Sequence, residues 1–201
     1  MLLPRIIPCL LIQNGGLVKT VRFSSPKYVG DPLNAVRIFN EKQVDELIVA
    51  DIDATVLGRE PDYDLISKLA CECRMPLCYS GGVNSISQIE RIISLGVEKV
   101  GLGSASANNL SLIEQASRRV GSQSIVSVMD VKKSGLLGLY QVFTHNSSNK
   151  VGFDLAEMAK LVESAGAGEI LLNSVDRDGT LSGYDYKLID IVRNSVRLPM
   201  T

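Results

Sequence analysis

The sequence predicts an α/β fold built on a parallel sheet for this chain of 201 residues. Short apolar runs alternate with segments of helical periodicity, giving about six strand–helix units joined by short turns. Several of these runs end abruptly in a carboxylate or a glycine. This ending is typical of buried parallel strands whose carboxyl ends carry a site. An open, doubly wound sheet and a closed barrel both fit this alternation.

An internal duplication favours the barrel. The segment 169–185, EILLNSVDRDGTLSGYD, repeats the pattern of 46–64, ELIVADIDATVLGREPDYD, and one offset of 123 positions relates 46 to 169, 53 to 176 and 76 to 199. Because the second unit then matches the sixth, each half holds about four units and the whole about eight. We therefore expect a (β/α)8 TIM barrel of the half-barrel duplication type.

The predicted barrel is one domain over 1–201, with a boundary between its halves near residue 121. The pattern stops at 198–201, where the seventh unit should begin. We therefore expect the barrel to be truncated after about six units, with units seven and eight missing. The chain is interpreted as a fragment, because an open barrel leaves an unpaired strand edge and an exposed core.

Each element follows from local patterning. Asp31 and Pro32 form a helix start, and Gly96 and Gly166 are placed to stop helices. The region 17–31 is basic and is predicted to be an irregular connection, whereas 139–144 is predicted to be an extra extended segment. The predicted strands are 6–12, 46–51, 76–80, 99–102, 125–129 and a run from 169, and the predicted helices are 32–42, 63–73, 86–95, 110–120, 155–164 and 186–192.

Composition narrows the class of protein. A hydrophobic fraction of 45% with 21% charged residues is ordinary for a globular enzyme, and a net charge of −1 predicts no nucleic-acid or membrane partner. The four cysteines lack a CxxC pair, which favours a reducing cytoplasm. Cys71 and Cys73, with His145 as the one histidine, are weak candidates for a metal site, so none is predicted. The N-terminal apolar run is too short to span a bilayer and is interpreted as the first strand.

Glycine-containing turns follow the third and fourth predicted strands. Gly81 and Gly82 end the third strand, and Gly103 and Ser104 end the fourth. Glycines there let backbone N–H groups cradle a phosphate, and the Ser104 hydroxyl can add a hydrogen bond. The alternative is that glycine only allows a tight turn. Two such turns on neighbouring strands favour a phosphate site.

The duplication predicts a second phosphate site in the other half of the chain. Asp178 and Gly179 would form part of it, and the missing units would form most of it. A ligand with a phosphate at each end would follow from two such sites.

An acid–base group is predicted at the end of the fifth strand. Asp130 ends that strand, and a carboxylate there can serve as a general acid or base, or only as a capping or salt-bridging group. Its equivalent in the other half of the barrel is Leu11, a hydrocarbon.

Several segments together resemble the cyclase subunit of imidazole glycerol phosphate synthase, the HisF-like family. They are RIIPCLLIQNGGLVKT, DELIVADIDAT, SGGV, EKVGLGSA, VSVMDVK and GAGEILLNSVDRDGTLSGYD. The related formimino-ribotide isomerase fits less well, because DRDGTLSGYD is typical of the cyclase. The resemblance implies a barrel that receives ammonia from a glutaminase and adds it to a bisphosphate ribotide. The products would be imidazole glycerol phosphate, for histidine biosynthesis, and an aminoimidazole carboxamide ribotide, and no cofactor would be used.

The resemblance also implies residue roles. Asp130 corresponds to one of the family's two catalytic aspartates, and Lys19 to the lysine on a mobile first loop that closes over substrate. Glu98 corresponds to an acidic residue facing the glutaminase. Gly82, Gly103 and Ser104 correspond to one phosphate site, although Gly103 replaces a more polar residue, and Asp178 and Gly179 to the second. Arg5, Glu46, Lys99 and Glu169 correspond to charged residues around an ammonia entrance, or alternatively to stabilising salt bridges.

Leu11 departs from the family, which carries its other catalytic aspartate there. Leucine cannot transfer a proton, so two further hypotheses stand beside cyclisation. In the first, the chain is a paralogue that relays ammonia to a sugar amidotransferase making an acetamidino sugar of lipopolysaccharide. In the second, it is a non-enzymatic scaffold that activates the glutaminase.

Overall fold

The computed structural model describes residues 4–135 and 138–201, so the first three residues of the N-terminal apolar run lie outside the described chain. Contacts between Cα atoms divide the chain into two compact units. The first comprises the residues up to Lys19 together with Lys27–Gly101, and the second comprises Thr20–Pro26 together with Leu102–Thr201. The expected half-barrel boundary near 121 stays a prediction.

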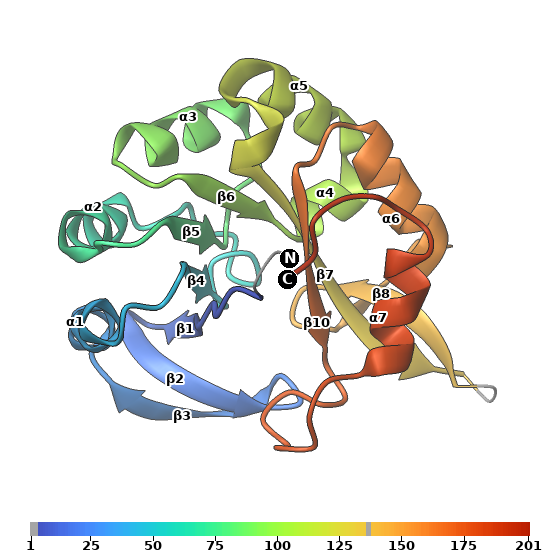
Figure 1. The fold of residues 1–201 in the computed structure, drawn as a ribbon, viewed down its shortest axis with the longest axis horizontal. Helices are drawn as coiled ribbons and strands as arrows, with labels where there is room; N and C mark the ends of the chain where they lie inside the picture. The colour runs from blue at the N-terminus through green and yellow to red at the C-terminus, as the bar shows by residue number, and fades with distance from the viewer. Residues whose placement is uncertain (1–3, 136–137) are drawn as a thin grey trace. The chain divides into compact units, whose positions relative to one another are not determined.

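In the first unit, the connection between each pair of consecutive parallel strands contains a helix. The strands are β1 (Cys9–Gln13), β4 (Leu47–Asp51), β5 (Leu77–Ser80) and β6 (Lys99–Leu102), and the helices are α1 (Pro32–Lys42), α2 (Tyr63–Glu72) and α3 (Ile86–Ser94). The helices lie along one side of these strands (Figure 1). The fold is therefore of the predicted α/β class with parallel β/α units.

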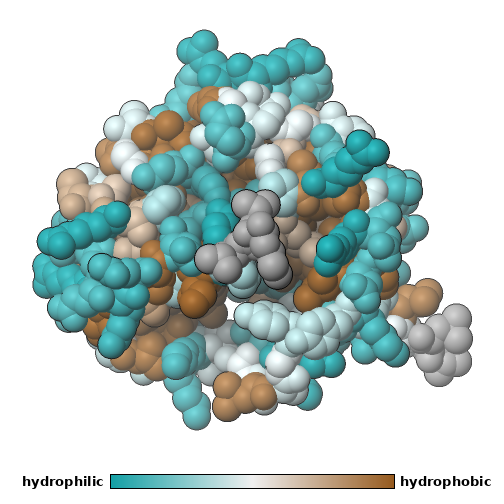
Figure 2. All heavy atoms as spheres, in the orientation of Figure 1, coloured by the Kyte–Doolittle hydropathy of each residue, from teal (hydrophilic) through white to brown (hydrophobic). Residues whose placement is uncertain are grey.

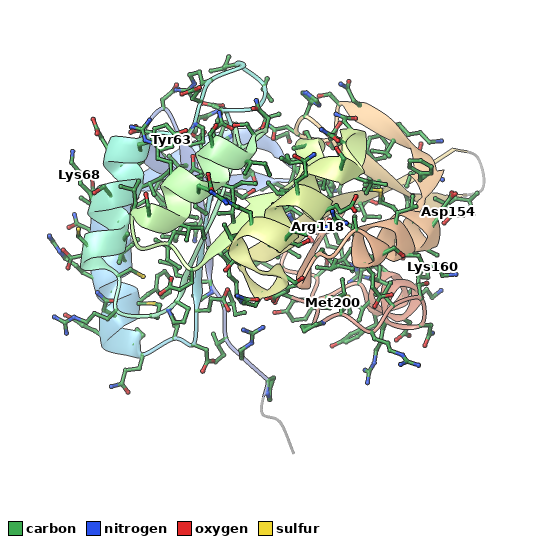
Figure 3. The ribbon with its side chains drawn as sticks, turned by 90° about the horizontal axis from the view of Figure 1, so that it is seen from above. Tyr63, Lys68, Arg118, Asp154, Lys160 and Met200 are labelled. Atoms are coloured by element: carbon green, nitrogen blue, oxygen red, sulfur yellow. The ribbon has the colours of Figure 1, made fainter. Side chains whose placement is uncertain are left out.

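The helices of this unit begin where the sequence predicts and bury one side. Asp31, Asp62 and Ser85 each accept a hydrogen bond from a backbone N–H in the first turn of α1, α2 and α3. The outer surface of α1 and α2 is mostly hydrophilic, at the left of Figure 2, and Lys68 of α2 extends outward in Figure 3. Apolar side chains on the inner side fill the core, as the periodicity predicts.

The first strand is shorter than predicted. It begins at Cys9 rather than at residue 6, and Ile6 is 67% exposed. Pro8 has no N–H to donate to a neighbouring strand, and this lack is a physical reason for the ladder to start after it.

The prediction of an irregular connection over 17–31 was wrong. The region forms β2 (Gly16–Val21), antiparallel to β1, and β3 (Ser24–Gly30), which lies next to β2. Val18 and Thr20 are buried, whereas Lys19 and Val21 are exposed. This alternation with period two is the strand signal that the basic residues obscured.

In the second unit, a parallel pair of strands is extended by an antiparallel hairpin. The elements are α4 (Ser104–Asn108), α5 (Leu110–Val120), a short 3-10 helix (Ser122–Ser124), β7 (Ile125–Ser134), β8 (Leu139–Thr144), β9 (Asn149–Asp154), α6 (Leu155–Ser164), β10 (Glu169–Ser174) and α7 (Tyr186–Arg193). Strand β10 pairs with β7 in parallel, and α6 lies beside α7 (Figure 1). Helix α4 and strand β9 were not predicted.

The fifth predicted strand is longer than expected, which corrects the position of Asp130. Strand β7 continues past residue 129 to Ser134, because β8 pairs with its second half in antiparallel register. Asp130 therefore lies inside a strand rather than at its end.

Residues 199–201 pair in parallel with β10. The N–H groups of Ile170 and Leu172 donate to the carbonyl oxygens of Pro199 and Thr201, and the Thr201 N–H donates back to Ile170. A parallel bridge joins Ile170 and Met200. The predicted start of a seventh unit at 198–201 stays a prediction.

Candidate active site

Asp130 is hydrogen-bonded to a neighbour that the sequence did not single out. The parallel register of β7 and β10 places it opposite Asn173, whose Nδ2 lies 2.9 Å from Oδ1 of Asp130. Burial raises the pKa of Asp130 to about 6, and the hydrogen bond from Asn173 opposes that rise. A carboxyl group whose pKa lies near neutral pH is partly protonated and partly ionised there. It can therefore donate or accept a proton, as general acid–base catalysis requires.

Leu11 lies in a row of small and apolar residues. In the registers of β1, β4, β5 and β6 it is opposite Ala50, Ala50 is opposite Ser80, and Ser80 is opposite Gly101. Register partners in a parallel sheet point to the same face. The row therefore offers one hydroxyl and no carboxylate, and nothing in it replaces an aspartate at position 11.

Two carboxylates that the site prediction omitted lie at the end of β4, where they organise a loop. Asp51 accepts hydrogen bonds from the N–H groups of Asp53 and Ala54, and Asp53 accepts one from Nε2 of Gln13. The guanidinium of Arg59 lies 3.9 Å from Asp51 and 3.8 Å from Asp53. Burial raises the pKa of Asp51, against these backbone hydrogen bonds. Because Asp51 is opposite Ile12, it points to the other face from Leu11.

The Gly81–Gly82 turn is closely packed. Both residues have positive φ, +123° and +70°, and an added Cβ would lie 2.4 Å from the Asp51 carbonyl oxygen or 2.7 Å from the Arg59 carbonyl oxygen. The Gly82 N–H donates to Oγ1 of Thr55 at 3.2 Å. Backbone packing alone therefore requires glycine at both positions. Phosphate binding by this turn stays a prediction.

The other predicted phosphate-site pair belongs to the second unit. Gly103 precedes α4, and Oγ of Ser104 accepts a hydrogen bond from the His145 N–H at 3.3 Å. The Ser104 hydroxyl can still donate its own proton. A Cβ at Gly103 would meet only Cβ of Val128, at 3.9 Å, so packing does not require glycine there.

Asp178 and Gly179 lie against the β2–β3 turn. Oδ2 of Asp178 accepts hydrogen bonds from the Thr20 hydroxyl at 2.8 Å and from the Phe23 N–H at 3.0 Å. A Cβ on Gly179 would lie 2.2 Å from the Thr20 carbonyl oxygen. Lys19, the residue before Thr20, is exposed. The predicted phosphate role of Asp178 and Gly179 is untested.

Three of the four predicted entrance residues form an ion cluster in the first unit. Nη1 of Arg5 and Nζ of Lys99 each lie 2.8 Å from the same oxygen, Oε2 of Glu46. Glu46 is buried, and a buried carboxylate is strongly destabilising unless cations pair with it, as Arg5 and Lys99 do here. Glu169 belongs to the second unit, where it is buried and accepts a hydrogen bond from the Thr201 hydroxyl.

Among residues 4–135 and 138–201, no three histidine, cysteine, aspartate or glutamate side chains are grouped so as to hold a metal ion. Cys71 is exposed and Cys73 is half-buried. Over the same residues, no helix combines the length and apolarity needed to cross a membrane.

The parallel β/α units, with a carboxyl group on one strand and glycine turns after others, are typical of α/β proteins, the class to which (β/α)8 barrels belong. Within that class, the family model described as histidine biosynthesis protein matches residues 5–201. The chain belongs to this family.

Curated relatives match nearly the whole chain. A protein of Leptospira interrogans is 51% identical over 201 residues, which is 100% of this chain and 79% of the relative. One from Pseudomonas aeruginosa is 50% identical over 196 residues (98% and 78%), and one from Lactococcus lactis subsp. cremoris is 40% identical over 200 residues (100% and 77%). All three are named as imidazole glycerol phosphate synthase subunit HisF (hisF2 in Pseudomonas), provisionally in the first two cases. The chain spans about four fifths of their length.

Replacing Gly81 by alanine should destabilise the protein strongly, because the new Cβ has no room beside the Asp51 carbonyl group. We expect a loss of about 3 kcal/mol or more in the free energy of unfolding, measured by urea denaturation. Gly15→Ala is the matched control, since Gly15 also has positive φ but nothing within 4 Å of an added Cβ. Equal losses in the two variants would refute the role of close packing.

Asp130→Asn should stabilise the fold at neutral pH. The folded-state pKa of about 6 lies above the value of an unfolded aspartate, so folding retains a proton that the unfolded chain loses. Wild-type stability should therefore fall between about pH 4 and pH 6 by roughly 2–3 kcal/mol and then level off. Asp130→Asn should remove that fall. Urea unfolding of wild type and Asp130→Asn across this pH range tests the prediction. If the free energy of unfolding of the two proteins changed with pH in the same way, the prediction would be wrong.

Asn173→Leu should raise the pKa of Asp130 further, because it removes the hydrogen bond that favours the ionised form. Carbon-13 NMR of the Asp130 carboxyl group measures this directly. Ser174→Ala is the control, since Ser174 is opposite Val131 rather than Asp130. A titration of Asp130 that is identical in Asn173→Leu and wild type would show that the hydrogen bond has no electrostatic effect.

Proposed function

We propose that the chain is the ammonia-using cyclase subunit of a glutamine amidotransferase of the imidazole glycerol phosphate synthase type. It would convert a bisphosphate formimino ribotide and ammonia to imidazole glycerol phosphate and an aminoimidazole carboxamide ribotide, in the cytoplasm. The observation that carries this proposal is Asp130, a carboxyl group with a pKa of about 6, oriented by Asn173 on the neighbouring strand. Asp130 is the proposed general acid–base, since ring closure requires protons to move on and off nitrogen and oxygen.

The remaining site residues are assigned to substrate binding. Lys19 supplies a cation toward the ribotide. Gly81, Gly82, Gly103 and Ser104 form one proposed phosphate site, and Asp178 and Gly179 belong to the loop that forms part of the second. The Ser104 hydroxyl supports this assignment, because the His145 N–H occupies its acceptor side and leaves its proton for a phosphate oxygen. No metal or organic cofactor enters the proposed reaction.

The opposite end of the strands is the proposed ammonia entrance, facing a glutaminase subunit. Arg5, Glu46, Lys99 and Glu169 would surround it. The buried Glu46 carboxylate with two cations on one oxygen supports the assignment, because a structural pair needs only one cation. Glu98 is the acidic residue proposed to face the glutaminase, although its carboxylate also accepts a hydrogen bond from the Leu77 N–H at 2.7 Å.

A second candidate function is ammonia relay. In this hypothesis the chain passes ammonia from the glutaminase to a sugar amidotransferase that makes an acetamidino sugar of lipopolysaccharide, without cyclising a ribotide. The row containing Leu11, Ala50, Ser80 and Gly101 favours it, because this row has no carboxylate to supply a second acid–base group. The scaffold hypothesis, in which the chain only activates the glutaminase, predicts no phosphate ligand.

Turnover of the bisphosphate ribotide with ammonium salt, and separately with glutamine and the cognate glutaminase, tests these functions. For the cyclase we expect measurable wild-type turnover, an increase of about 10²-fold in Leu11→Asp because a second acid–base group is supplied, and its loss in Asp130→Asn. Leu11→Asn is the matched control, with similar size and polarity but no proton to transfer.

The outcomes separate the candidates. A silent wild type that still binds the ribotide and stimulates the glutaminase would contradict the cyclase and support the relay. Stimulation without any ribotide binding would leave only the scaffold.

A further inference from the structure

The turn between β2 and β3 is strained. It is a two-residue turn in which Arg22 and Phe23 both have positive φ, +53° and +58°. Turns that need positive φ at both central positions normally use Asn-Gly, because a Cβ is unfavourable there. An Arg-Phe pair in this conformation persists only if neighbouring groups hold it.

Asp178 is the group that holds this turn. Its Oδ2 accepts hydrogen bonds from the Thr20 hydroxyl and the Phe23 N–H, and its carbonyl oxygen accepts one from the Arg22 N–H at 3.0 Å. Gly179 allows the approach, since an added Cβ would lie 2.2 Å from the Thr20 carbonyl oxygen. One aspartate thus contacts both central residues of the turn and, in the strand before it, Thr20, all more than 150 positions away in sequence.

The same contacts make Asp178 a poor direct ligand of a phosphate. An ionised carboxylate has acceptors only and repels a phosphate oxygen. Both hydrogen bonds to its side chain come from the turn, so the turn already uses the carboxylate. Phosphate binding by this loop would then fall to the backbone at Gly179.

We propose that Asp178 is a positioning residue that fixes the β2–β3 turn and, through Thr20, the adjacent Lys19. Holding the hydroxyl of Thr20 fixes the alternation of β2, in which Thr20 is buried and Lys19 exposed. The effect on catalysis rests on the proposed function of Lys19 as a substrate-binding residue. The effect on the conformation of the turn is independent of that function.

Amide hydrogen exchange of residues 18–24 tests the structural part without any substrate. We expect Asp178→Ala to raise exchange in this segment by about tenfold or more, because the turn opens locally. Asp178→Asn should keep exchange close to wild type, since the amide oxygen can accept both hydrogen bonds. Asp176→Ala is the control, because Asp176 lies on the same loop but accepts its hydrogen bond from the Lys133 N–H.

A suppressor variant makes the test specific. Adding R22N and F23G to Asp178→Ala supplies the favoured turn residues, so exchange should return most of the way to wild type. If Asp178→Ala leaves exchange unchanged but weakens binding of inorganic phosphate, Asp178 is a ligand and the proposal is wrong. If exchange rises and the suppressor does not lower it, the turn is not what Asp178 holds, and the proposal is again wrong.

Turnover adds the catalytic part. With Lys19 intact, Asp178→Ala should lower turnover of the bisphosphate ribotide and the suppressor should restore it. In a Lys19→Ala background, adding Asp178→Ala should lower turnover little further, because both changes act through the same Lys19 amine. If no variant turns over the ribotide, the proposed function fails while the exchange result still decides the role of Asp178.

Discussion

The parallel hydrogen-bonded register of β7 and β10 is the constraint on which the position of Asp130, and with it the proposed acid–base chemistry, depends. It places Asp130 opposite Asn173, so that two short side chains meet on one face without any loop to position them. Antiparallel pairing of β8 along the other edge of β7 extends the strand past Asp130 and holds its backbone on both sides. Asp130 is thus fixed by ladders rather than by a turn, and rigid placement of this kind is what a proton-transferring group requires.

Glycine serves different physical needs at the two predicted phosphate turns. At Gly81 and Gly82 the backbone of a neighbouring loop occupies the space that a side chain would need, so glycine is required whether or not a ligand binds. At Gly103 an added Cβ would meet only Cβ of Val128, at 3.9 Å, so packing does not require glycine there. Its φ of −93° with a ψ of −96° lies outside the main regions allowed to residues with a Cβ, and this backbone conformation is a physical reason for glycine at that position.

The sequence predicts elements that are determined locally. The helices at 110–120 and 155–164 have the predicted bounds, because amphipathic period and helix-ending signals act within a few residues. The β2–β3 hairpin was missed because its turn uses Arg22 and Phe23 instead of Asn-Gly. The partners of Asp130 and Asp178 could not be predicted, since they come from contacts between strands or loops far apart in the chain.

Position 11 illustrates how a group expected for the proposed acid–base chemistry can be absent while the sheet around it is kept. Changing an aspartate for leucine in a row of small and apolar side chains removes the cost of desolvating a carboxylate, so the fold itself is not penalised. The Glu46 cluster does not tolerate substitution in the same way. Losing either Arg5 or Lys99 removes a cation that stabilises the buried Glu46 carboxylate. A chain that needed only a stable sheet would gain from apolar residues at both places. Keeping the costly cluster while position 11 is a hydrocarbon therefore argues that the charged end of the strands has a function beyond stability, and ammonia entry is the function proposed for it.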